Sequence, residues 1–277
     1  MNNRYERYIK TVMYIFLGVC AFIALYPIFF CIITSIKTPE EYVTNKLGLP
    51  EHITFDNYKY VWENGNMLRY FLNTLLVIPV GLVFYLFICV SAGFAFGRLR
   101  FKGRLPLFLT VLFLMIFPQM LLSMQIFQIC RTLKLVNNYL GLILVWVAYF
   151  SPFGTYIMTT YYSTVPMSLV ESARLDGAKL YQMLIRIMVP IAQPMIVVIT
   201  IIGTQSMWNE LPFSMLLLQN ADMRTITHSL GMLKGQYGLK DPILMSAILC
   251  AASVPILLFL FFQKKITMGS YSGAVKG

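Results

Sequence analysis

Charged residues are scarce in this 277-residue chain. Only 12% of its residues are Asp, Glu, Lys or Arg, while 58% are hydrophobic. A soluble domain of ordinary composition carries roughly 25% charged residues, so the deficit indicates a membrane protein. The 22 basic residues outnumber the 11 acidic ones, but they stand beside hydrophobic runs. Membrane orientation explains that placement better than binding to nucleic acid does.

Metal-ligating and catalytic groups are scarce as well. The two histidines are far apart, and the five cysteines lie within or beside apolar runs without ligand spacing. The sequence therefore predicts no metal site, no bound cofactor and no enzyme activity. It also lacks the G-x-x-x-x-G-K-[ST] loop that holds nucleotide phosphates, so any ATP-driven step needs a partner protein.

Long hydrophobic runs are what the chain does have. A membrane-spanning helix needs about 20 apolar residues, and six runs are long enough. They predict an all-α integral membrane protein with six transmembrane helices, at 12–36, 71–97, 105–129, 140–162, 194–218 and 242–262. Pro27, Pro79, Pro118 and Pro212 fall inside these runs, where neighbouring helices can satisfy the freed backbone groups. The first run is longer than a signal-peptide core, so we interpret it as a retained span.

Three parts of the chain follow from these runs. Residues 1–70 hold an N-terminal tail, the first span and a first external loop. Residues 71–262 form the transmembrane domain, with five helices and a polar loop at 165–190, and residues 263–277 form a C-terminal tail. Basic residues gather in the N-terminal tail, in "RLRFKGR" at 98–104 and after the sixth span. The positive-inside rule places these segments, and both termini, in the cytoplasm.

The polar segment "ESARLDGAKLYQMLIRIMVP", residues 171–190, separates the fourth and fifth runs. Pro166 suits the first turn of a helix, and Ser168 and Glu171 have capping-box spacing. Gly177 interrupts the helical pattern and favours a turn. The expected shape is a short helix, a bend at Gly177 and a second helix that ends before Pro190. Taken alone, this shape also suits a surface helix that merely connects two spans.

The same segment resembles the EAA loop found in the membrane subunits of ABC importers. That pattern is Glu-Ala-Ala, two residues, Asp-Gly-Ala, and a spacer that ends in an apolar residue and Pro. Ser172 replaces one alanine, and Leu184 stands where many relatives carry Phe. The matching positions are Glu171, Ala173, Asp176, Gly177, Ala178 and Pro190. Three other segments, "MWNELPFSMLLL" (207–218), "KGQYG" (234–238) and the terminal "GAVKG", resemble the smaller six-span subunit of maltose-type and multiple-sugar importers.

This resemblance covers nearly the whole chain and implies a permease subunit of an ATP-driven, binding-protein-dependent sugar importer of the bacterial cell membrane, with oligosaccharide favoured as cargo. It implies a heterodimer with a second homologous permease, two ATP-binding subunits that use ATP and Mg, and an extracellular solute-binding protein. The EAA loop would dock in the ATPase through Glu171, Ser172, Ala173, Asp176, Gly177 and Ala178. Glu171 either contacts a basic residue of the ATPase or caps its own helix.

Polar residues inside the spans are candidates for the sugar path, because intramembrane polar groups are costly and often functional. A sugar offers hydroxyls and apolar ring faces to such a mixture. The candidates are Asn73, Gln119, Gln125, Gln205, Trp208, Asn209 and Glu210. Hydrogen bonds between helices are the alternative role for these residues, and Glu210 has the further alternative of lying solvated at the outer interface. The loop at 219–241 either meets the binding protein or is a plain connection.

Two other classes remain open. A secondary sugar transporter would work without an ATPase, and it gives no reason for the EAA pattern. An ABC permease for a non-sugar solute would share that pattern, but the Trp208-Asn209-Glu210 segment and "GAVKG" argue against it.

Overall fold

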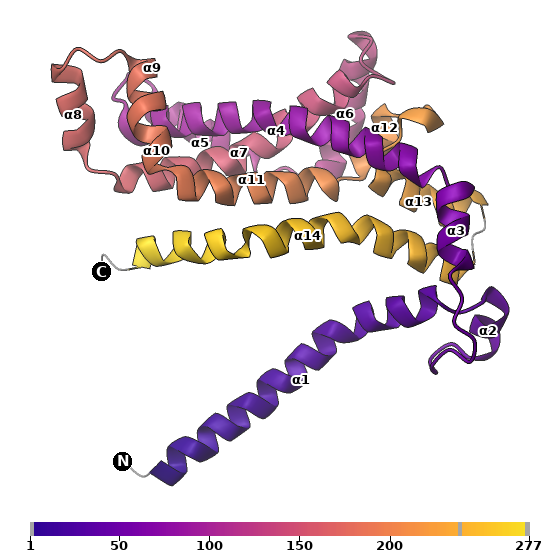
Figure 1. Cartoon of the computed structure of the whole chain (residues 1–277). Coiled ribbons are helices and arrows are strands. Elements are labelled where there is room, and N and C mark those ends of the chain that lie inside the picture. The colour runs from indigo at the N-terminus through magenta and orange to yellow at the C-terminus, as the bar shows by residue number, and fades with distance from the viewer. Residues whose placement is uncertain (1–2, 238–239, 275–277) are drawn as a thin grey trace. The chain divides into compact units, whose positions relative to one another are not determined.

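The structure is a computed structural model that describes residues 3–237 and 240–274. Every regular element in these residues is helical, and no strand occurs among them (Figure 1). The all-helical prediction is therefore confirmed. Gly238 of "KGQYG" and the last three residues of "GAVKG" lie outside the described residues. The chain forms two compact units, Met1–Met67 with Met232–Ala252 (unit 1) and Leu68–Gly231 with Ser253–Gly277 (unit 2).

Four unbroken helices are long and apolar enough to cross a membrane. They lie in α1 (Asn3–Ser35), α4 (Met67–Arg98), α7 (Tyr139–Thr164) and α14 (Asp241–Ala274). Two further candidates are bent pairs. One joins α5 (Arg104–Leu114) to α6 (Gln119–Thr132) at 102°, and the other joins Leu180–Ile191 to α11 (Gln193–Trp208) at 83°. The chain therefore has four to six candidate spans, the higher number if each bent pair crosses once.

The predicted runs at 105–129 and 194–218 are not continuous helices, which corrects the sequence prediction. Pro118 precedes α6 with φ −62° and ψ 139°, and Pro212 opens α12 (Pro212–Leu217). Proline has no backbone N–H and disfavours a helical residue before it, so it starts helices more readily than it sits inside them. Pro27 and Pro79 do lie inside helices, as predicted.

The polar segment has the predicted short helix and bend. α8 (Met167–Leu175) is followed by a turn and α9 (Leu180–Met183). The second helix does not end before Pro190, however. It continues through a π turn at Leu184–Met188 into α10 (Val189–Ile191). Pro190 cannot donate to the regular helical ladder, and the wider π turn lies just where that bond would be lost.

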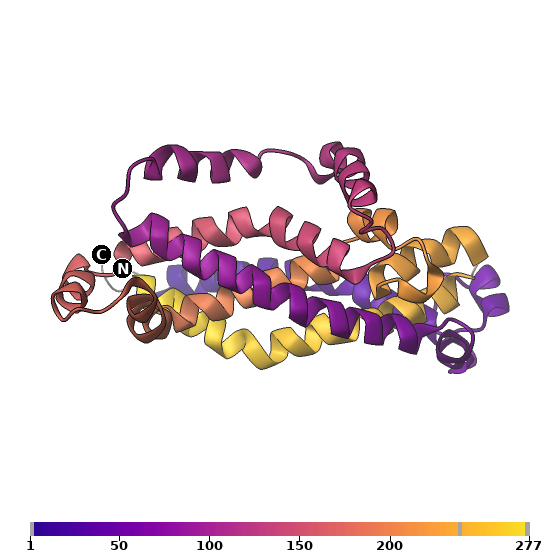
Figure 2. The ribbon, with the colours of Figure 1, turned by 90° about the horizontal axis from the view of Figure 1, so that it is seen from above.

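Unit 2 is built around α4, α7 and α11, which run alongside one another in Figures 1 and 2. The ring of Tyr85 on α4 is almost fully buried. A Cβ added at Gly154 of α7 or at Gly203 of α11 would collide with that ring. Small residues let membrane helices approach closely, so these two glycines make room for the aromatic core. The α4–α5 connection and α8 lie at one end of unit 2, and α12 lies at the other (Figures 1 and 2).

Unit 1 has a hydrogen-bonded loop after α1 that contains α2 (Pro39–Thr44) and leads to α3 (Asp56–Glu63). The buried ammonium of Lys37 donates to the carbonyl oxygens of Asn45 at 2.7 Å and Gly48 at 2.6 Å. The Asn57 amide donates to the carbonyl oxygens of Ser35 and Lys37. These bonds fold the loop back onto the end of α1. α13 (Ile226–Tyr237) leads from unit 2 into unit 1, after a 3-10 turn at Ala221–Met223.

Candidate coupling loop and transport path

The turn after α8 is a Schellman motif, which explains the Asp-Gly-Ala spacing. Ala178 N–H donates to the Ala173 carbonyl at 3.0 Å, and Gly177 N–H donates to the Arg174 carbonyl at 3.1 Å. This bond pair closes a helix C-terminus when the residue after the cap is left-handed. Gly177 has a φ of +78°, a conformation that glycine adopts without steric cost. The sequence thus stops α8 at a fixed point.

The six predicted coupling residues differ in exposure. Glu171, Ser172, Asp176 and Gly177 are exposed, Ala178 is half-buried, and Ala173 is buried. Leu175, which the sequence analysis did not single out, is 89% exposed. A large apolar side chain exposed beside a rigid turn is a candidate for contact with a partner.

The predicted capping box is not formed. α8 begins after Pro166, which makes no side-chain capping bond, and Ser168 is exposed. The Glu171 carboxylate has no hydrogen-bond or ion-pair partner among the described residues. Proline fixes the helix start two residues earlier than the serine would have done. A self-capping role for Glu171 therefore loses its support, and the carboxylate stays available to another molecule.

Glu210 lies at the centre of a buried hydrogen-bond network. It is 4% exposed, so the alternative of a solvated outer glutamate is wrong. Its Oε1 accepts from Gln119 Nε2 at 2.7 Å and from Phe213 N at 2.6 Å, and its Oε2 accepts from Trp146 Nε1 at 2.9 Å and from Ser214 N at 3.1 Å. All four partners are N–H donors, which matches an ionised carboxylate that can only accept.

This network joins three elements at a break. Gln119 is the first residue of α6, directly after the 102° bend, and Trp146 lies within α7. Phe213 and Ser214 are in the first turn of α12. Glu210 therefore holds the bent α5–α6 pair, α7 and α12 together, and the broken span keeps a defined position despite its missing backbone bonds.

Asn73, on α4, also joins separate parts of unit 2 by hydrogen bonds. Its amide donates to the carbonyl oxygens of Asp222 at 2.8 Å and Arg224 at 3.0 Å. One turn before Asn73 on α4, Arg69 forms an ion pair of 2.7 Å with Asp222. Both N–H groups of Asn73 are thus used to hold the connection between α12 and α13.

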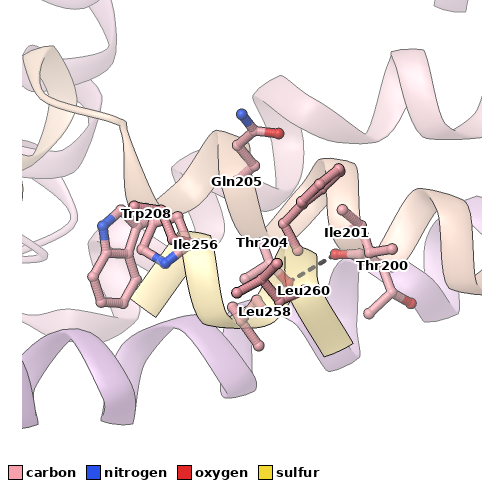
Figure 3. Close-up of a pocket in the computed structure, with 10 residues that line it drawn as sticks. Thr200, Ile201, Thr204, Gln205, Trp208, Ile256, Leu258 and Leu260 are labelled. Carbon is pink, nitrogen blue, oxygen red and sulfur yellow. Dashed lines mark hydrogen bonds between the residues drawn. The ribbon is translucent and has the colours of Figure 1, made fainter. Parts of the chain in front are cut away.

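Two other predicted path residues, Gln205 and Trp208, line an apolar pocket of about 320 Å³ between α11 and the middle of α14, at residues 255–260. Figure 3 shows Trp208 beside Ile256, and the amide of Gln205 pointing away from Leu258 and Leu260. Phe71 packs edge-on against Trp208, with ring centroids 5.9 Å apart. Gln125 and Asn209 are exposed and take no part in this pocket. The predicted path residues therefore fall into separate groups rather than one site.

Trp146 and Leu175 are the functional candidates that sequence reasoning missed. A tryptophan in the middle of a span signals a donor that needs a partner when buried. Its pairing with Glu210, 64 residues later, left no pattern in the sequence. The described residues contain no group of three or more His, Cys, Asp or Glu side chains that could hold a metal ion.

Comparisons with known proteins identify the family. No family model matches the chain. The chain is 31% identical over 261 residues to the arabinooligosaccharides transport system permease protein AraQ of Halalkalibacterium halodurans, and the match covers 93% of each chain. It is 27% identical over 268 residues to the diacetylchitobiose uptake system permease protein DasC of Streptomyces coelicolor, covering 96% of this chain and 95% of that protein.

The fold is also that of a known importer chain. A chain from the crystal structure of a bacterial ABC transporter involved in importing alginate, an acidic polysaccharide, superposes with a TM-score of 0.81. It is 24% identical, and the match covers 95% of this chain and 98% of that one. The chain belongs to the family of carbohydrate ABC transporter permeases. It is a membrane permease subunit, as the EAA pattern predicted, and its relatives are permease subunits rather than enzymes.

Proposed function

We propose that the chain imports an oligosaccharide as one half of a heterodimer with a second, homologous permease. Two ATP-binding subunits on the cytoplasmic side and an extracellular solute-binding protein complete the importer. Relatives named for arabino-oligosaccharide and diacetylchitobiose transport support an oligosaccharide cargo. The partners bind ATP and Mg, and this chain holds no cofactor of its own.

The proposed topology has six spans in the bacterial cell membrane, with both termini cytoplasmic. Six spans result if each bent pair crosses once. The basic "RLRFKGR" connection and α8 lie at the same end of unit 2 (Figure 2), which supports a shared cytoplasmic side. Within this topology, residues 71–262 form the importer domain, between the part at 1–70 and the tail at 263–277.

The observation that carries the proposal is the rigid end of α8. Glu171, Ser172, Asp176 and Leu175 are exposed beside a Schellman turn, while Ala173 anchors the helix to the protein. Such an element can enter a cleft of the ATPase and move as a body when that subunit closes. Gly177 and Ala178 form the turn that transmits the motion.

We assign different roles to the polar residues that the sequence placed on the sugar path. Gln205 and Trp208 line a pocket and are the proposed sugar contacts. Gln119 and Glu210 hold its neighbouring helices in place, and Asn73 holds the connection after α12. Gln125 and Asn209 are exposed here, and we assign them to surfaces that meet the second permease.

The first experiment is to tag the full-length chain, extract it gently and identify the co-purifying proteins by mass spectrometry. The proposal expects an ATP-binding subunit and a second multispan permease in comparable amounts. Leu175→Asp should lower the amount of ATP-binding subunit about tenfold, because a charge replaces an apolar group at the interface. Leu133→Asp, at another exposed leucine, directly after α6, is the control and should leave the amount of ATP-binding subunit unchanged.

Two results would reject the proposal. Recovery of the chain alone, with sugar uptake intact after reconstitution, would establish an ATP-independent transporter. Equal loss of the ATP-binding subunit in both leucine variants would show that α8 is not the docking element. Uptake assays with an oligosaccharide, an amino acid and phosphate then separate a sugar importer from a permease for another solute.

A further inference from the structure

A second pocket lies beside the connection between α4 and α5, and the transport proposal gives it no role. It is open, with a volume of about 720 Å³. Its walls come from the end of α4, the connection itself, the first turns of α5 and one face of α7, all of which belong to unit 2. It shares no residue with the pocket in Figure 3 or with α8.

Two arginines without counter-charges lie in or near this pocket. Arg104 lines it, and Arg98 is close enough for the two positive charges to repel each other. Neither side chain forms an ion pair with a described residue. The Nε of Arg98 is buried without a hydrogen-bond partner. Both side chains are half-buried, and two unpaired positive charges held near each other favour a bound anion.

Other donors converge on the same place. Thr159 lines the pocket and its hydroxyl is buried without a partner, whereas the neighbouring hydroxyls of Thr160 and Ser163 bond to carbonyls of their own helix. The pocket also includes Gly103 and the start of the 11-residue helix α5. In this first turn Arg104 N–H donates to the Phe101 carbonyl and Pro106 has no N–H, so the Leu105 N–H and the positive end of the helix dipole favour an anion there.

Beyond these donors the wall is apolar. The rings of Phe101 and Phe108 pack on Phe96, with centroids 6.2 Å and 5.4 Å away, and Leu105 and Pro106 extend the surface along α5. A free phosphate ion would use only the arginines and the hydroxyl. A phospholipid would use both parts, with its phosphate at the donors and an acyl chain on the aromatic wall.

We propose that this pocket binds an anionic phospholipid. Its phosphate lies between Arg98 and Arg104 and accepts a hydrogen bond from Thr159, and one acyl chain covers Phe108. The bound lipid relieves the repulsion between the arginines and fixes the start of α5 against α4 and α7. The inference needs only that the chain lies in a membrane, and it does not depend on the nature of the cargo.

The test measures lipid retained by the tagged full-length chain, together with whatever subunits co-purify. The protein is incubated in mild detergent with equal amounts of phosphatidylglycerol and phosphatidylcholine and then washed, and lipid per chain is quantified by mass spectrometry. Phosphatidylglycerol should be enriched. Arg98→Gln with Arg104→Gln should lower its retention about tenfold, because hydrogen bonds to charged groups are lost. Arg104→Gln alone, at a half-exposed position, guards against misfolding of the double variant and should show a smaller loss.

The matched control is Arg100→Gln with Lys102→Gln. It removes two charges from the same connection, but both residues are exposed, unlike the half-buried Arg98, and neither lines the pocket. It should leave retention unchanged, whereas Phe108→Ala should lower retention without changing the charge. Equal losses in the two charge pairs would show diffuse attraction to the loop and overturn the proposal. Displacement of the lipid by inorganic phosphate would also overturn the proposal. So would retention without a preference for phosphatidylglycerol, which would point to a protein partner at this pocket instead.

Discussion

Glu210 is a buried carboxylate of unit 2 whose position depends on hydrogen bonds from several helices. Its two carboxylate oxygens accept four hydrogen bonds from three elements while the side chain is 4% exposed. Each carboxylate oxygen thus has two N–H donors, which offset the hydration that the side chain loses on burial. The residue therefore acts through geometry, by holding other groups in place.

Replacing Glu210 by glutamine should destabilise the protein although the shape is nearly unchanged. The new NH₂ group faces two N–H donors, so about two donors lose their acceptor, at a cost of roughly 1–3 kcal/mol each. Thermal unfolding in lipid nanodiscs measures the loss. Glu171→Gln is the matched control and should leave the unfolding midpoint unchanged, because that side chain is exposed without a partner. Equal midpoints for both variants would mean that the network contributes no stability.

The α8 turn is the element whose behaviour depends on one backbone conformation. A Cβ at Gly177 would meet no atom within 4 Å, so an alanine there costs only the strain of its positive φ, roughly 1–2 kcal/mol. The exposed Arg174 and Lys179 flank the turn and provide trypsin sites. Gly177→Ala should speed cleavage at Arg174 by about fivefold or more, since local opening becomes easier.

Gly177→Asn tests whether strain from the positive φ at residue 177 causes the faster cleavage. Asn tolerates the left-handed conformation better than Ala, so Gly177→Asn should cleave more slowly than Gly177→Ala. Cleavage at the distant Arg131 serves as the internal standard and should not change. If both variants cleave like the unmodified chain, the left-handed turn does not limit opening of α8.

How far the sequence predicts each element depends on how local its cause is. The short helix and the bend at Gly177 are encoded by neighbouring residues, and both were predicted. The breaks at Pro118 and Pro212 were missed because hydrophobicity alone runs straight through them. The exposure of Leu175 and the pairing of Trp146 with Glu210 depend on tertiary packing, which leaves no local pattern. The sequence also did not predict that the path residues fall into separate groups, because that grouping depends on tertiary packing too.

At the scale of the whole molecule, His228 in α13 makes stability depend on pH. It is 3% exposed, and burial, together with the nearby charge of Arg224, lowers the pKa of His228 to about 4. The unfolded chain takes up this proton near pH 6.5, and the folded chain does so only near pH 4. Stability should therefore fall as the pH decreases from about 6.5 to 4, by on the order of 1–3 kcal/mol from this residue.

Unfolding midpoints at pH 7 and pH 5 test this expectation. His228→Gln should reduce the difference between the two, whereas His52→Gln should not, because His52 is exposed. Other groups titrate in the same range, so the comparison between variants is what counts. An unchanged difference in His228→Gln would show that folding does not lower the pKa of this histidine.

The position of Glu210 along the chain also bears on how the protein is made. A ribosome delivers Gln119 and Trp146 before it delivers Glu210, and Phe213 and Ser214 follow within four residues. The two distant donors can therefore already be in the membrane when the carboxylate arrives. The order of synthesis thus spares the insertion machinery an anion without partners, and moving Glu210 ahead of its donors in a rearranged chain would remove that protection.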